Sequence, residues 1–251
     1  MGEALALGLV SAGWSAPGSL VVVEPLERRR DELAEAHPDM AIVGAVPAAG
    51  GAVVAVKPQD VEAACADIAA AGIPRVLSIA AGVPLASLET WLGPGVRVVR
   101  AMPNTPALVG AGAAAMAAGS GAEDSDMAWA EEILSAVGVV RRVTEPMLDA
   151  VTGLSGSGPA YVFLVVESLI EAGVLNGLPR DVSRALAVQT VLGSGRLLAE
   201  SGLEPEVLRA GVTSPGGTTA AGLRVLESRA VRSAFIEAVA AATERSRELG
   251  R

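Results

Sequence analysis

Hydrophobic positions in the first half of the chain fall into short, nearly continuous runs, separated by stretches with helical spacing. Each run is four residues long and rich in Val or Leu, which suits the strands of a parallel sheet covered on both faces. The runs are Leu20–Val23, Val53–Val56, Val76–Ile79 and Val96–Val99. The predicted helices are Leu26–Ala36, Gln59–Ala71 and Leu85–Trp91. Because strands and helices alternate, we predict an α/β domain built from βαβ units.

The second half of the chain shows little strand alternation and predicts an all-α domain. Its long Ala/Leu/Val-rich segments are separated by Gly and Pro. They are Ala160–Ala172, Arg180–Glu200, Leu203–Ala210, Thr218–Glu227 and Val231–Leu249. We place the boundary near Arg142–Glu145, which gives predicted domains of residues 1–143 and 144–251.

One segment of the helical half, Tyr161–Ile170, is apolar on nearly all faces. In a water-exposed domain such a helix has to be buried on all sides. A domain of about a hundred residues does not easily bury several such helices alone. We therefore infer an obligate homodimer with interleaved helices; burial against the first domain is the alternative.

Composition and charge narrow the class of protein. The chain has 251 residues, of which 51% are hydrophobic, so a sizeable core is expected and disorder is excluded. A net charge of −9 and only 2% aromatic residues argue against nucleic acid as a partner. His37 is the one histidine and Lys57 the one lysine, which argues against a His-based triad or a His-rich metal site.

The expected location is cytoplasmic, with no membrane partner. A single cysteine, Cys65, cannot form an internal disulfide and indicates a reducing compartment. The longest apolar run, Ala41–Val56, is interrupted by Gly and Pro and falls short of the ~20 residues a bilayer requires. The chain starts without a basic leader and carries Glu3 early, so no signal peptide is expected.

The N-terminus carries a trace of a dinucleotide-binding turn. Such folds need a strand, a Gly-rich turn and a helix whose N-terminal amides receive the pyrophosphate. Here only Gly2 could belong to the turn, and Glu24 follows it by 22 residues. An acidic residue at about that spacing binds the adenine ribose hydroxyls. The alternative is that Glu24 caps a surface turn before Pro25.

Two further motifs follow predicted strands, where α/β sheets bind ligands. Lys57 ends one strand and is followed by Pro58 at the first turn of a helix, so it is a candidate cofactor contact. A solvated lysine is the alternative. Met102–Pro106 forms a rigid turn that presents Asn104, or else a structural loop held by that side chain.

The helical half contains two Gly-rich motifs. The segment Leu154–Tyr161 (LSGSGPAY) has no histidine to activate its serines, so we interpret it as a place where small residues allow close approach. The segment Thr213–Ala220 (TSPGGTTA) puts free amides at a helix N-terminus, which suits a carboxylate. The alternative for this second motif is ordinary N-capping.

Taken together, these motifs resemble pyrroline-5-carboxylate reductase, in order and over nearly the whole chain. The most specific blocks are MPNTPA, SGSGPAY and TSPGGTT, with AVKPQ before them. The resemblance implies a Rossmann-like NAD(P)-binding domain followed by a helical domain that interlocks in a dimer, often assembled into decamers. It also implies the last step of proline biosynthesis. In that step NADPH or NADH transfers a hydride to the C=N carbon of 1-pyrroline-5-carboxylate, giving L-proline.

The resemblance also assigns roles to residues. It places Met102 and Asn104 near the nicotinamide. Together with Gly2 and Glu24 from the spacing argument above, the expected cofactor-binding residues are Gly2, Glu24, Ala55, Val56, Lys57, Pro58, Ile79, Ala80, Ala81 and Asn104. The expected substrate-binding residues are Glu145, Ser214, Gly216, Gly217, Thr218 and Thr219. Among them Thr219 is the expected catalytic residue, because its hydroxyl would bond the ring nitrogen.

The start of the chain departs from the family pattern. Family members begin with a strand and a Gly-x-Gly-x-x-Gly turn, of which only Gly2 is present here. We expect a misassigned start codon, with a catalytically impaired, oligomer-forming remnant as the alternative. A third interpretation is another imine reductase or a β-hydroxyacid reductase on the same fold. A β-hydroxyacid reductase would be expected to carry a catalytic lysine in its helical domain, and the chain has no lysine after Lys57.

The choice of cofactor stays open at this point. Glu24 favours NADH by repelling a 2′-phosphate, whereas Arg28, Arg29 or Arg30 could receive that phosphate.

Overall fold

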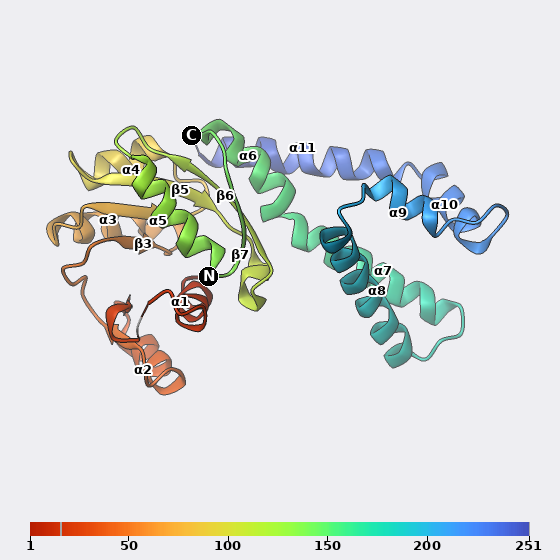
Figure 1. The fold of residues 1–251 in the computed structure, drawn as a ribbon, viewed down its shortest axis with the longest axis horizontal. Helices are drawn as coiled ribbons and strands as arrows, with labels where there is room; N and C mark the ends of the chain where they lie inside the picture. The colour runs from red at the N-terminus through yellow and green to blue at the C-terminus, as the bar shows by residue number, and fades with distance from the viewer. Residues whose placement is uncertain (16, 251) are drawn as a thin grey trace. The chain divides into compact units, whose positions relative to one another are not determined.

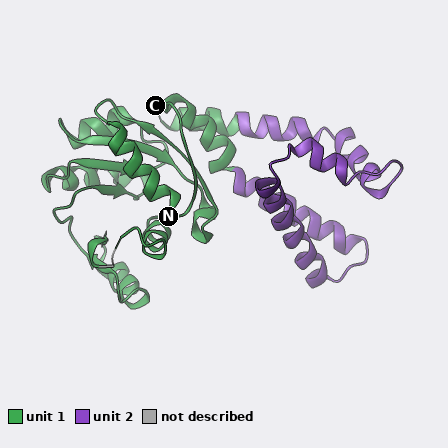
Figure 2. Cartoon of the chain, in the orientation of Figure 1, with its two compact units in different colours: residues 1–157, 241–251 green, residues 158–240 purple. Residues whose placement is uncertain are grey.

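The computed structural model describes residues 1–15 and 17–250, which divide into two compact units (Figure 2). Unit 1 comprises Met1–Ser157 and Ala241–Arg251, and unit 2 comprises Gly158–Ala240. Strands and helices alternate through unit 1, and unit 2 is helical (Figure 1). The sequence-based expectation of an α/β domain followed by an all-α domain is confirmed.

Unit 1 contains two β-sheets in the described part of the chain. The smaller has two parallel strands, β1 (Val21–Val23) and β2 (Ala41–Val43). The larger has five strands in the order β3-β4-β5-β6-β7. Their bounds are β3 Ala52–Val54, β4 Arg75–Ser78, β5 Arg97–Met102, β6 Gly112–Ala118 and β7 Gly138–Arg142.

The larger sheet is mixed. Strands β3, β4 and β5 pair in parallel, with Val54 opposite Ser78 and Ser78 opposite Arg100. Strand β6 runs antiparallel to β5, and β7 is parallel to β6. The four predicted strands are therefore confirmed, and β2, β6 and β7 are additional.

Helices cover both faces of this sheet. The α-helices of unit 1 are α1 (Gly2–Ser11), α2 (Glu27–Ala36), α3 (Val61–Ala70), α4 (Leu85–Leu92), α5 (Asp124–Ser135) and α6 (Leu148–Val151). Short 3-10 turns are η1 (Pro17–Ser19), η2 (Pro58–Asp60), η3 (Thr105–Val109) and η4 (Glu145–Met147), and η5 (Thr152–Gly156) is a π-helical turn. Helix α5, absent from the sequence-based prediction, starts at a capping box between Glu123 and Asp126.

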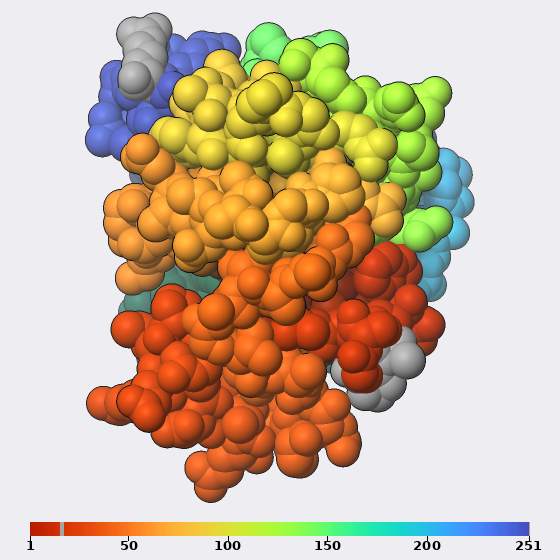
Figure 3. Space-filling view, turned by 90° about the vertical axis from the view of Figure 1, so that its left-hand side faces the viewer, coloured from red at the N-terminus to blue at the C-terminus, as the bar shows by residue number. Residues whose placement is uncertain are grey.

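Alternation along the strands separates two hydrophobic clusters. Leu77 and Val99 pack with α1 and α5 on one face of the sheet. Val76 and Val98 pack with α3 and α4 on the other face. Because successive strand residues point to opposite faces, both faces are buried, as the nearly continuous apolar runs predict. Figure 3 shows one face of the molecule, formed mainly by the red to yellow residues of the N-terminal half.

Unit 2 contains α7 (Gly158–Leu175), α8 (Arg180–Ser201), α9 (Pro205–Gly211), α10 (Thr218–Ser228) and the first half of α11 (Val231–Leu249). All five predicted helices are confirmed. Helices α7 and α8 pack closely because Gly173 has no Cβ, which would overlap the Ser183 hydroxyl. That hydroxyl is buried and donates to the Ile170 carbonyl at 2.7 Å.

Helix α7 has no buried residue within this chain. Phe163 is 60% exposed and Leu164 is 64% exposed. The expected burial of this helix on all sides is therefore not provided by the chain itself. The helical segment Glu145–Leu175 also has the length and apolar composition of a membrane span. The sequence-based expectation that no segment is long and apolar enough to span a membrane is therefore wrong by this criterion.

The C-terminal end of α11 belongs to unit 1. Ser246, buried in the structure, donates its hydroxyl to the Asp149 carboxylate of α6 at 2.6 Å. Leu249 lies against Gly82, 3.8 Å from where a Cβ would stand, and so next to the loop that follows β4.

Packing of the larger sheet predicts a contrast between two leucines. Leu88 is fully buried under α3, whereas Leu108 in η3 is 67% exposed. We expect Leu88→Ala to lower the free energy of unfolding by about 2–5 kcal/mol, since it leaves a cavity in the core. Leu108→Ala should change that free energy by no more than about 0.5 kcal/mol. Urea titration of both variants measures the difference, and equal effects would contradict this description of the core.

Candidate functional site

Three loops meet at the carboxyl edge of the larger sheet. Because β3, β4 and β5 are parallel, the residues that follow them lie at the same edge. Those residues are Ala55–Pro58, Ile79–Ala81 and Pro103–Asn104. The first loop is exposed, and the second begins with the buried Ile79 and Ala80. The expected cofactor residues of these loops are thus brought to one side of the sheet.

The N-terminus of α1 joins this edge. A Cβ on Gly2 would stand 3.0 Å from the Cβ of Ala55, closer than ordinary packing allows. No side chain caps α1, so its first amides and the positive end of its dipole are free for an anion. A glycine-backed helix N-terminus beside a strand's carboxyl end fits a dinucleotide pyrophosphate.

Glu24 continues the ladder of the smaller sheet, with its amide donating to the Val43 carbonyl at 3.0 Å. One carboxylate oxygen accepts from the Leu26 amide at 3.0 Å. The turn-capping interpretation of Glu24 is therefore met, and the second carboxylate oxygen remains for a ligand. Binding of the ribose by Glu24 stays a prediction.

Asn104 is used by the protein itself. Its side-chain amide donates to the Ser155 carbonyl at 3.0 Å, and its oxygen accepts from the Ala113 amide at 2.8 Å. The side chain therefore ties three segments together: the loop after β5, strand β6 and the π-helical turn. Nearby, a Cβ on Gly156 would stand 2.7 Å from the Met102 methyl carbon, so the glycine makes room for Met102. Both polar atoms of the Asn104 side chain thus have partners within the protein, and the expected contact between Asn104 and a cofactor stays a prediction.

Glu145 is likewise engaged within unit 1. Its Oε1 accepts from the Leu85 amide at 2.7 Å, at the start of α4, and from Arg100 Nη1 at 2.8 Å. Arg100 is largely buried, with 12% of its side chain exposed. Sequence reasoning missed Arg100, because nothing local connects residues 45 positions apart. The expected contact between Glu145 and substrate remains a prediction.

In unit 2, the segment before α10 forms a tight turn. The Gly217 amide donates to the Ser214 carbonyl at 3.0 Å, Pro215 follows Ser214, and Gly216 has φ of +69°. Proline and then glycine with positive φ is the pattern of a type II turn. A Cβ on Gly217 would overlap the Ser214 hydroxyl, so both glycines are required.

This turn leads into a helix that no side chain caps. Gly217 is the N-cap residue, which leaves the amides of Thr218 and Thr219 at the positive end of α10. The alternative that this motif is an ordinary N-cap is therefore wrong as far as a side-chain cap is concerned. That the motif binds a carboxylate stays a prediction. Thr218 is exposed and Thr219 half-buried.

Cys65, the one cysteine of the chain, is buried. Burial raises the pKa of the Cys65 thiol to about 11, so this cysteine is a neutral thiol at physiological pH and a poor nucleophile. Within residues 1–15 and 17–250, no three His, Cys, Asp or Glu side chains gather in a way that could hold a metal.

The fold and this strand edge define a class: an oxidoreductase with a Rossmann-like, nicotinamide-dinucleotide-binding domain. Residues 1–82 match a family model described as NADP oxidoreductase coenzyme F420-dependent. Residues 145–249 match one described as pyrroline-5-carboxylate reductase dimerisation. The chain belongs to the pyrroline-5-carboxylate reductase family, because full-length relatives share well over 30% of its residues.

One such relative is the pyrroline-5-carboxylate reductase of Synechocystis. It is 47% identical over 100% of this chain and 95% of its own length. The Arabidopsis thaliana enzyme is 41% identical over 99% of this chain and 92% of its own length.

Among solved structures, the reductase of Coxiella burnetii has a TM-score of 0.93 at 36% identity, covering 100% of this chain and 95% of that one. The Plasmodium falciparum reductase, solved with NADP bound, has a TM-score of 0.85 at 31% identity with the same coverage.

The close approach of α1 to β3 predicts an effect on nucleotide binding. Gly2→Val should weaken binding of NADH and NADPH about tenfold or more, because its side chain would push the helix N-terminus away from Ala55. Gly50→Val is the matched control, since Gly50 has open space around it and precedes β3. Titration calorimetry measures both, and equal affinities for the two variants would refute the placement of the site.

Proposed function

We propose that this chain reduces 1-pyrroline-5-carboxylate to L-proline with NADPH or NADH. The observation that carries the proposal is the 47% identity to a pyrroline-5-carboxylate reductase over the whole chain. The free N-terminus of α1 at the strand edge and the uncapped turn before α10 support it. No observation favours the alternative of an impaired remnant.

We propose that the turn before α10 binds the substrate carboxylate. Backbone amides of Thr218 and Thr219 offer donors at a positive helix end, so no lysine or arginine is needed. Rigidity supports this role, because Pro215 and the positive φ of Gly216 fix the direction of the amides before substrate arrives. Ser214 completes the turn through its carbonyl.

In the proposed reaction, the nicotinamide supplies the hydride and the protein supplies orientation. The Thr219 hydroxyl donates to the lone pair of the ring nitrogen in the neutral imine. This hydrogen bond polarises the C=N bond and stabilises the negative charge that develops on the nitrogen as the hydride reaches the carbon, before the nitrogen takes up a proton. Ala55–Pro58 and Ile79–Ala81 line the dinucleotide at the edge of the sheet. Glu145 fixes the start of α4 and orients the side chain of Arg100 in β5, whatever further contact it makes with substrate.

The proposal includes a division of labour along the chain. Residues 1–143 bind the dinucleotide, and residues 144–251 bind substrate and form the homodimer. The match of residues 145–249 to a dimerisation family supports the second part, and so do the exposed apolar side chains of α7. We further propose a cytoplasmic enzyme with neither membrane nor nucleic acid as a partner, and decamers as the larger assembly.

Thr219→Ala should lower kcat/KM for 1-pyrroline-5-carboxylate about 10²-fold or more, because the donor to the ring nitrogen is lost. Thr219→Ser should restore most of the rate. Thr90→Ala is the control, since that exposed hydroxyl only donates to the Ala86 carbonyl. The readout is loss of nicotinamide absorbance that depends on the substrate. A wild-type protein that binds dinucleotide without such turnover would overturn the proposed function.

A further inference from the structure

The loop that carries Glu24 is held by an arginine. Arg30 Nη1 donates to the backbone carbonyls of Glu24 at 3.0 Å and Pro25 at 2.7 Å. A Cβ on Gly44 would stand 3.3 Å from the Arg30 guanidinium carbon, so the guanidinium packs closely on this glycine. Together with the Leu26 amide, these contacts fix both the backbone and the carboxylate of Glu24. The Arg30 guanidinium therefore already has hydrogen-bond partners within the protein.

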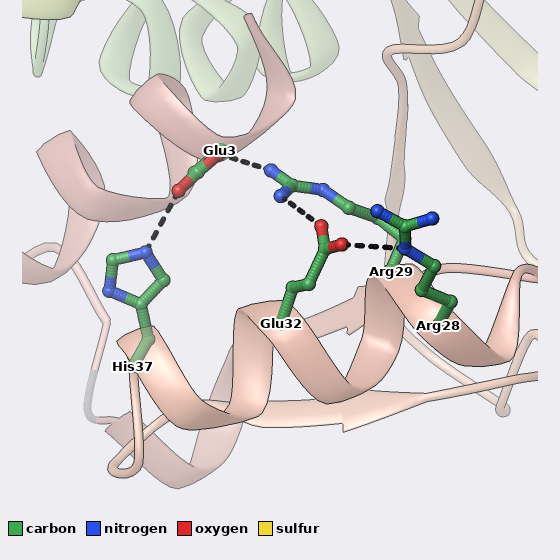
Figure 4. A network of polar contacts seen from close by, with 5 residues as sticks. All are labelled: Glu3, Arg28, Arg29, Glu32 and His37. Atoms are coloured by element: carbon green, nitrogen blue, oxygen red, sulfur yellow. Dashed lines mark hydrogen bonds and ion pairs between the residues drawn. The ribbon is translucent and has the colours of Figure 1, made fainter.

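The two neighbouring arginines are occupied as well (Figure 4). Glu32 accepts from Arg28 Nε at 3.1 Å and from Arg29 Nη1 at 3.0 Å. Arg29 Nη2 donates to Glu3 Oε2 at 2.9 Å, and the other oxygen of Glu3 lies 2.9 Å from His37 Nε2. Hydrogen bonds from Arg29 and Arg28 lower the pKa of Glu32, so its carboxylate stays charged at neutral pH.

This network adjoins the dinucleotide site. Glu3 lies in the first turn of α1, directly after the Gly2 that packs on Ala55. Its ion pair with Arg29 places α2 beside the helix end that suits the pyrophosphate. Glu24 immediately precedes α2, at the end of β1. The adenine ribose of a dinucleotide bound at α1 would therefore face Glu24 and an arginine run whose guanidinium groups are already paired.

We propose that Glu24 makes this chain select NADH over NADPH, while Glu3 and Glu32 withhold Arg28 and Arg29 from a 2′-phosphate. The free oxygen of Glu24 accepts from the 2′-hydroxyl of NADH. The 2′-phosphate of NADPH meets a fixed carboxylate instead, and Arg28, Arg29 and Arg30 each already have a hydrogen-bond partner in the protein. The inference rests on the proposed function only in that the chain binds a nicotinamide dinucleotide.

The test is the ratio of the NADPH and NADH dissociation constants, measured by calorimetry without substrate. We expect the wild-type protein to bind NADH about tenfold or more tightly than NADPH. Glu24→Gln should bring the ratio close to one. Glu3→Gln should tighten NADPH binding alone, because it removes one of the two carboxylate charges that hold Arg29. Glu27→Gln is the matched control, with the same charge change one residue into α2, and should leave the ratio within about twofold.

Using a ratio on one sample keeps the test valid where a variant is partly unfolded. Equal or tighter binding of NADPH by the wild-type protein would overturn the inference, as would an unchanged ratio in Glu24→Gln. These outcomes are separate from failure of the proposed function, which is read from substrate turnover in protein that binds either dinucleotide.

Discussion

Parallel pairing of β3, β4 and β5 is the constraint on which the candidate site depends. It places the ends of three strands, far apart in sequence, at one edge of a buried sheet. The Ile79 amide extends the ladder by donating to the Val54 carbonyl at 3.0 Å, so the second loop starts from a fixed point. Leu77 and Val99 are fully buried beneath this edge. In α/β proteins, nucleotides bind at short exposed loops that follow the carboxyl ends of such buried strands.

Strands made of branched residues were predictable from the sequence, and strands made of small residues were not. Val and Leu runs indicate β1, β3, β4 and β5, because such residues favour a sheet buried on both faces. Strand β6 reads GAAAMAA, and alanine favours helix, so only its tertiary pairing with β5 and β7 makes it a strand. Helix α5 did leave a signal, since Met127, Ala130, Ile133 and Leu134 have helical spacing and all are buried.

The motifs of the site were also found from sequence, but not what their side chains do. Asn104 stands out as the polar residue of a Pro-rich turn after a predicted strand, whereas Glu145 was named only from the resemblance to the family. Their partners lie 51 and 45 residues away, at Ser155 and Arg100, and no local pattern reports such distances. Backbone roles were more accessible, because the order Pro215, Gly216, Gly217 dictates a turn whatever surrounds it. Side-chain chemistry thus needed the fold, whereas loop geometry did not.

The separateness of the smaller sheet has a thermodynamic consequence. A pair of strands alone is marginally stable, and β1–β2 shares no ladder with the larger sheet in the described part of the chain. Side-chain bonds such as those of Glu3 add to its attachment. This sub-sheet should therefore open at a lower free energy than the whole unit. If the dinucleotide reaches from Gly2 to Glu24 as proposed, it can bind only while this sub-sheet is folded against the larger one. Its apparent affinity would then depend on the fraction of molecules in which the sub-sheet is folded.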